Sequence, residues 1–216
     1  MGFLKKFTKQ EISWMMYDWA NSAHSVIVVT ILPIFFDSVA SCTADSVSSM
    51  STWGYATSIA MAIVALAAPF LGVFGDIRGM RKKLFTAFLL LGVVSVAGLA
   101  FTPLMDFTSS TAVASKVAML VLVLYILSTI GFDASCIYYD AFLTDVTTED
   151  RMDSVSTLGY GLGYIGGSTI PLLIFLIMNA VGVPMLTSLA IIFAITAVWW
   201  LVFSLPLLKN CEQTTG

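Results

Sequence analysis

Six long apolar stretches constrain this chain more than any other feature of its sequence. A helix that crosses a bilayer core of about 30 Å needs about 20 residues. Six stretches meet that length, at about residues 14–36, 53–75, 84–104, 117–143, 155–179 and 185–208. They are continuous apolar runs, without the alternation that strands of a membrane β-barrel require. The sequence therefore predicts an all-α, multi-pass integral membrane protein with six transmembrane helices in a lipid bilayer.

The composition excludes other classes of protein. Only 11% of the residues are charged, and the mean hydropathy is +0.94. A chain with so few charges is neither disordered nor an ordinary soluble domain, and it has no basic arm for nucleic acid. The single histidine cannot build a metal site alone, so we expect neither a metal nor a cofactor.

The positive charges predict the orientation of the helices. Nine of the ten Lys and Arg residues fall before the first stretch, in the second-to-third and fourth-to-fifth connections, or after the sixth stretch. Lys116 is the exception. By the positive-inside rule, both termini are expected in the cytoplasm, as an N-terminal segment (1–13) and a tail (209–216). We expect no cleaved signal peptide, because acidic residues interrupt the approach to the first stretch.

Polar side chains form two stripes inside the predicted membrane helices. Carboxylates at membrane depth are costly and usually face a cavity or a partner. Asp133 and Asp140 are seven residues apart, so they share one face about 10 Å apart along the axis. No Lys or Arg lies inside the membrane to neutralise them, so they could be protonated, bind a cation or meet an ammonium group. The competing interpretation is that Asp18 and Asp140 are helix caps at the membrane surface, in contact with water. The candidate pathway residues are Asp18, Asn21, His24 and Ser25 in the first stretch, and Thr129, Asp133, Cys136, Tyr139 and Asp140 in the fourth.

His24 admits two interpretations. Histidine titrates near neutral pH, which suits a proton relay. A hydrogen-bonded structural histidine is the alternative.

The connection between the second and third stretches is a candidate gate loop. It follows the pattern G-x-x-x-D-x-x-G-x-[RK]-[RK], with glycines for close approach and a sharp turn, and an acid among four cations. The competing interpretation is a basic loop that only sets topology. The candidate gate residues are Gly72, Gly75, Asp76, Arg78, Gly79, Arg81 and Lys82.

Small residues recur along the second and fifth stretches. Such faces let helices pack backbone to backbone. Because a two-fold dimer would use both faces twice, we predict a seam between two bundles at these positions. The candidate seam residues are Ala65, Ala68, Gly159, Gly163 and Gly167.

These motifs together resemble the major facilitator superfamily. The gate loop is similar to the signature loop of that superfamily. Three further motifs resemble the branch that contains the autophagy-related vacuolar amino-acid effluxers of yeast and their bacterial relatives. They are Tyr17-Asp18-Trp19-Ala20-Asn21-Ser22, Tyr139-Asp140-Ala141-Phe142-Leu143-Thr144-Asp145 and the glycine-rich run 156–167. The chain departs from the branch pattern at Asp140, where Asn is usual, and at Thr144, where Pro is usual.

The resemblance implies a fold and a function. Facilitators have two six-helix halves, each made of two three-helix repeats, with the substrate path between the halves. This chain corresponds to the N-terminal half. The resemblance implies a secondary active transporter of a small solute, with amino acids suggested by analogy. It would work by alternating access, with Asp133 as proton or ammonium site and the gate loop as a latch. The membrane would be a bacterial inner membrane or a eukaryotic vacuolar-type membrane.

Three arrangements of such a half remain open. The chain could form a homodimer that rebuilds two halves, which the small-residue stripes favour. It could pair with a separately encoded half, as a structural or regulatory subunit. It could be a truncated piece without transport of its own. An enzyme is not expected, since the Gly-x-Ser-Gly and Gly-x-Gly-Asp elements of intramembrane proteases are absent.

Overall fold

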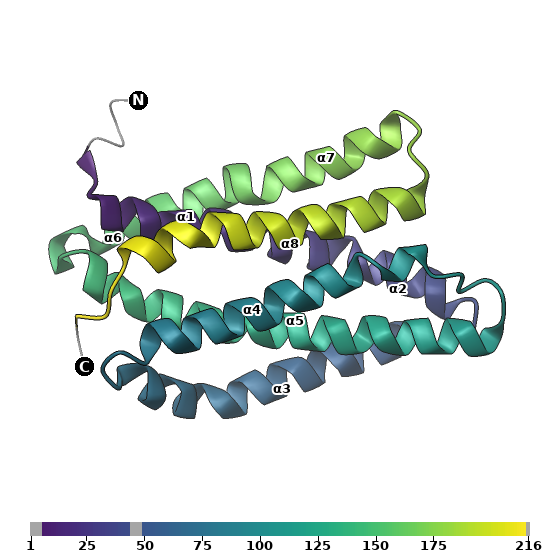
Figure 1. The fold of residues 1–216 in the computed structure, drawn as a ribbon, viewed down its shortest axis with the longest axis horizontal. Coiled ribbons are helices and arrows are strands. Elements are labelled where there is room, and N and C mark those ends of the chain that lie inside the picture. The colour runs from purple at the N-terminus through teal and green to yellow at the C-terminus, as the bar shows by residue number, and fades with distance from the viewer. Residues whose placement is uncertain (1–5, 44–48, 215–216) are drawn as a thin grey trace.

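The computed structural model describes residues 6–43 and 49–214, and within these ranges the chain is helical without strands. The helices run nearly parallel and antiparallel in one bundle, and α1 begins at the end of the bundle where α8 ends (Figure 1). We call this the terminal end. The elements are α1 (Lys9–Thr30), α2 (Leu32–Ala40), α3 (Ser49–Asp76), α4 (Arg81–Leu99), η3 (Thr102–Leu104), α5 (Thr111–Val146), η4 (Glu149–Arg151), α6 (Met152–Leu162), η5 (Gly163–Ser168), α7 (Thr169–Ala180) and α8 (Met185–Asn210).

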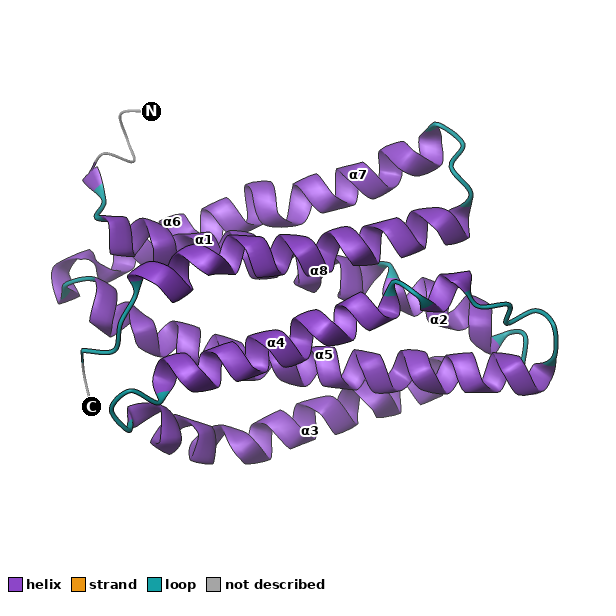
Figure 2. Cartoon of the chain, viewed as in Figure 1, coloured by secondary structure: helices purple, strands orange, loops and turns teal. Residues whose placement is uncertain are grey.

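The elements combine into six candidate membrane spans among the described residues, which confirms the predicted fold class (Figure 2). Every span extends beyond its apolar run at one end or both, because polar residues continue or cap the helices. The spans are Lys9–Ala40, Ser49–Asp76, Arg81–Leu104, Thr111–Val146, Glu149–Ala180 and Met185–Asn210.

A polar cluster fixes the start of α1 at the terminal end. Thr8 and Glu11 form a capping box, in which the Glu11 amide donates to Thr8 Oγ1 (3.1 Å) and the Thr8 amide donates to Glu11 Oε2 (2.7 Å). The same carboxylate accepts from Arg151 Nη2 (2.8 Å) and Thr147 Oγ1 (2.7 Å). The cluster therefore ties the first span to the connection between the fourth and fifth spans.

The α4–α5 pair packs most closely where two glycines meet. A Cβ on Gly131 would lie 2.5 Å from the amide nitrogen of Gly92 and 2.8 Å from the carbonyl oxygen of Phe88. The Trp200 ring of α8 covers the other side of Gly92. Small residues let membrane helices approach in this way. By contrast, α3 lies at the edge of the bundle beside α5 and buries few side chains (Figure 1).

The glycine stripe of the fifth span packs against α1 of the same bundle. A Cβ on Gly163 would lie 2.6 Å from Ser22 Oγ, and one on Gly159 would lie 2.9 Å from Asp18 Oδ2. A Cβ on Gly167 would collide with the Trp19 carbonyl oxygen. These three glycines were predicted to form a seam between bundles. Their open face is instead occupied by the first helix, so it is not free for a second bundle.

Candidate functional site

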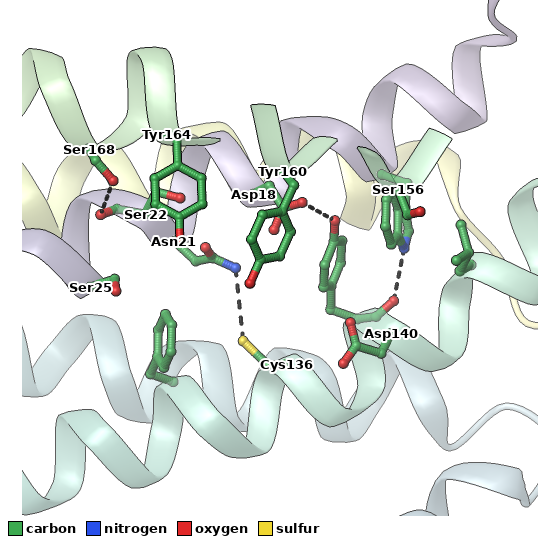
Figure 3. Close-up of a pocket in the computed structure, with 14 residues that line it drawn as sticks. Asp18, Asn21, Ser22, Ser25, Cys136, Asp140, Ser156, Tyr160, Tyr164 and Ser168 are labelled. Carbon is green, nitrogen blue, oxygen red and sulfur yellow. Dashed lines mark hydrogen bonds between the residues drawn. The ribbon is translucent and has the colours of Figure 1, made fainter. Parts of the chain in front are cut away.

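A cavity of about 510 Å³ lies between α1, α5 and the fifth span. It brings together six of the nine candidate pathway residues: Asp18, Asn21, Ser25, Cys136, Tyr139 and Asp140. Figure 3 shows side chains from all three spans converging on this space. The other lining residues are Trp14, Ser22, Phe132, Leu143, Ser156, Tyr160, Tyr164 and Ser168.

Asp18 is the buried acid of the cavity, with only 9% of its surface exposed. The Tyr139 hydroxyl donates to its Oδ2 at 2.9 Å. A dashed line at Asp18 in Figure 3 marks this hydrogen bond. Tyr139 is itself fixed by Trp14, whose indole N–H donates to the Tyr139 carbonyl oxygen (2.9 Å) and whose ring stacks on it with centroids 4.3 Å apart. Oδ1 of Asp18 makes no hydrogen bond to any described residue. One oxygen of a rigidly held carboxylate is therefore left for a ligand.

Asn21 lies one turn further along α1 and is 6% exposed. Its Nδ2 lies 3.9 Å from Cys136 Sγ, a weak contact with a poor acceptor. Its amide oxygen has no protein hydrogen-bond partner among the described residues. Asn21 thus adds a buried, largely unsatisfied amide beside Asp18.

The fifth span contributes a stripe that sequence analysis missed. Ser156, Tyr160, Tyr164 and Ser168 are four residues apart, and all four line the cavity. Tyr160 and Tyr164 are 64% and 65% exposed, with ring centroids 5.5 Å apart. The four-residue spacing is visible in the sequence. The same segment carries the glycine repeat, which sequence analysis interpreted only as a packing face.

Three candidate pathway residues do not line the cavity. His24 is 3% exposed and stacks on Phe132, with ring centroids 4.8 Å apart, and neither ring nitrogen has a hydrogen-bond partner. Thr129 is buried in α5. Asp133 is half-buried, and its Oδ2 also lacks a partner. Among the described residues, no hydrogen-bonded path joins His24 to the cavity.

The gate loop centres on Arg81 rather than on Asp76. Gly79 adopts a φ of +79°, which explains why glycine stands at the turn into α4. The Arg81 side chain is 4% exposed, donates to the Ala141 carbonyl oxygen (3.0 Å) and pairs closely with Asp145. Its contact with Asp76 is longer, at 3.4 Å, and the Asp76 side chain is 78% exposed. Sequence analysis did not select Asp145, which lies 64 residues away along the chain.

The segment after α8, residues 211–214, folds over this loop. The Gln213 side chain accepts from the Gly79 and Arg81 amides (2.9 and 3.3 Å) and donates to the Gly75 carbonyl oxygen (3.1 Å). It thereby caps α4, whose N-terminus has no capping side chain of its own. Lys82 Nζ donates to the Cys211 carbonyl oxygen (3.2 Å). Burial raises the pKa of the Cys211 thiol to about 12, so the thiol stays neutral.

Gln213→Ala should speed hydrogen exchange at the Gly79 and Arg81 amides. Each loses a hydrogen bond worth about 1 kcal/mol, which corresponds to about fivefold faster exchange. The measurement is amide exchange of the purified chain by mass spectrometry. Gln10→Ala serves as the control, because the Gln10 side chain is exposed at the same end. Equal exchange in both variants would contradict the capping role.

Comparison of the chain with known proteins shows the family to which it belongs. The family model described as "Vacuole effluxer Atg22 like" matches residues 7–215. The chain belongs to this family. A curated relative, the uncharacterized MFS-type transporter YxiO of Bacillus subtilis (strain 168), is 43% identical over 218 residues. The match covers 97% of this chain and 48% of the relative, so the chain spans about half the length of that relative. No solved structure matches the chain.

These matches confirm the resemblance to the major facilitator superfamily and its vacuolar-effluxer branch. Together with the six spans, they identify a multi-pass integral membrane protein of an MFS-type transporter family.

Proposed function

We propose that this chain supplies one six-helix bundle of a secondary active transporter, which moves a small solute by alternating access. The observation that carries the proposal is the open cavity on the bundle, with the buried carboxylate of Asp18 in its wall. Rare intramembrane carboxylates mark substrate or ion pathways in membrane proteins. Amino acids are the leading solutes only by analogy with the vacuolar amino-acid effluxers of yeast that the sequence motifs resemble.

A second six-helix bundle would complete the path. Asp140, Tyr160 and Tyr164 line the cavity and are exposed, so a facing bundle would cover them. The exposed face of α3, with Ala65 exposed and Ala68 half-buried, also lies free of this chain's other helices and suits a seam with that bundle. The proposal takes the second bundle to be another copy of this chain. The alternative is a separately encoded half, with this chain as a non-transporting partner.

The mass of the purified chain in nanodiscs distinguishes these two arrangements. A homodimer should give about twice the 23.3 kDa of one chain after correction for lipid. A monomer would contradict the homodimer and direct the search to a partner half.

The proposed cycle combines a movement of the two bundles with a latch at the gate loop. The two bundles would rock about the cavity, as is typical of transporters built from repeats. The gate loop would latch the terminal end when the cavity opens to the other side, with Asp76 and Arg78 exposed where the second bundle could contact them.

Asp18 replaces Asp133 in this proposal as the group that binds the coupling proton or the substrate. Asp18 lines the cavity and is held by Tyr139, whereas Asp133 lies outside the lining. Coupling to protons is part of the proposal, because a carboxylate without a neighbouring cation can change its protonation state during the cycle.

Asp18→Asn should abolish most uptake driven by a pH gradient. Asn keeps an oxygen for the Tyr139 hydroxyl, so folding should be preserved while the charge is lost. Hydrogen bonds to charged groups contribute about 1.5–3 kcal/mol, which predicts at least about a tenfold loss. The measurement is uptake of a panel of radiolabelled amino acids and amines into proteoliposomes. Asp106→Asn, in an exposed loop, is the control. Undiminished uptake by Asp18→Asn would reject the role of Asp18.

A further inference from the structure

We infer that the cavity binds a small organic ammonium group, held between the Asp18 carboxylate and the aromatic rings of the cavity wall, and that the lining of this cavity offers no cationic side chain to a substrate's carboxylate. The inference rests on the proposed function in one respect, that the cavity is the substrate site.

The charge of the cavity points to a cation. Its lining includes Asp18 and Asp140 but no Lys, Arg or His. Two cations at the terminal end are held elsewhere, Arg81 by Asp145 and Arg151 by Glu11. Asp18 is buried, so its charge acts through a lower dielectric than water, and the exposed Asp140 adds a second negative charge to the cavity wall.

Partly unsatisfied polar groups lie where such a cation would bind. Asp18 is more than nine-tenths buried, yet only its Oδ2 accepts a hydrogen bond from the protein. Most buried polar side-chain atoms have at least one hydrogen-bond partner, and Oδ1 of Asp18 has none among the described residues. Asn21, equally buried, presents an amide oxygen one turn away. An ammonium group has N–H donors for both oxygens.

The aromatic residues favour an organic cation over a metal ion. Five of the lining residues carry aromatic rings: Trp14, Phe132, Tyr139, Tyr160 and Tyr164. A cation over the face of Trp or Tyr gains about 0.5–2 kcal/mol. Metal ions instead require several oxygen, nitrogen or sulfur ligands. No group of three His, Cys, Asp or Glu side chains that could hold a metal occurs among the described residues.

The same lining disfavours a carboxylate. A substrate carboxylate placed in this cavity would meet two aspartates and no cation. It would have to point away from this bundle, towards whatever faces the cavity. The volume of about 510 Å³ lies within the range of small-molecule sites. A simple amine should therefore bind this chain at least as well as the amino acid with the same side chain.

The experiment compares three molecules that share the isobutyl side chain of leucine. Isoamylamine has only the ammonium group, 4-methylpentanoate has only the carboxylate, and leucine has both. Each is titrated by calorimetry into the wild-type chain in nanodiscs, with empty nanodiscs as the blank for lipid partitioning. Isoamylamine should bind at least as tightly as leucine, and 4-methylpentanoate should show no binding.

Variants assign the binding to the cavity. Asp18→Asn should weaken binding of isoamylamine at least about tenfold, and Tyr160→Ala should weaken it about twofold to thirtyfold. Tyr55→Ala is the matched control, because Tyr55 is an exposed tyrosine on α3 outside the cavity. Circular dichroism spectra confirm that each variant is folded.

The outcomes separate this inference from the proposed function. Absence of isoamylamine binding, equal binding of 4-methylpentanoate, or indifference to Asp18→Asn would overturn the inference, even if uptake into proteoliposomes still depends on Asp18. Binding of isoamylamine that needs Asp18, without uptake of any solute, would support the inference and count against transport by this chain.

Discussion

Gly131→Ala should destabilise the bundle strongly, although alanine is normally the better helix residue. In an open helix position, replacing Gly by Ala stabilises by up to about 1 kcal/mol. At position 131 the new methyl group would lie 2.5 Å from the Gly92 amide nitrogen and 2.7 Å from its Cα. Both are backbone atoms, so α4 and α5 must separate. Overpacking of this kind costs about 1–3 kcal/mol, and occasionally more.

Gly161→Ala is the matched control for this prediction. It makes the same substitution in a helix of the same bundle, but a Cβ at Gly161 would meet no atom within 4 Å. The two variants should therefore shift stability in opposite directions. The measurement is unfolding of the purified chain in detergent, followed by circular dichroism. If both substitutions had the same effect, the close α4–α5 crossing would not hold in solution.

The fold could largely be predicted from the sequence, because a bilayer requires long apolar helices and these are directly visible. The ends of the spans could not be placed to the residue. They depend on polar caps such as Thr8 and Ser110, which lie outside the apolar runs. The small-residue stripe of the fifth span predicted close packing correctly as a physical property. A stripe does not specify which helix approaches it, and here the neighbour is α1 of the same bundle.

The candidate site could be predicted only in part. The α1 stripe follows from spacing, because Asp18, Asn21 and Ser25 repeat at helical intervals. The contact between Asp18 and Tyr139 joins residues 121 positions apart, and no local pattern indicates it. In the gate loop, Asp76 is the acid nearest to the arginines in sequence. Asp145 is the closer partner of Arg81 because the fold brings the ends of α4 and α5 together.

Arg81→Ala should be among the most destabilising changes at the terminal end. The side chains of Arg81 and Asp145 are 4% and 0% exposed. Removing one partner of a buried pair leaves an uncompensated charge and costs about 3–5 kcal/mol. Arg78→Ala, at an exposed arginine of the same loop, should change stability by less than about 0.5 kcal/mol. The double variant Arg81→Ala/Asp145→Asn should recover part of the lost stability, because it also removes the negative charge of Asp145. Detergent unfolding measures all three variants. Equal stabilities of Arg81→Ala and Arg78→Ala would show that the Arg81–Asp145 pair does not hold the gate loop.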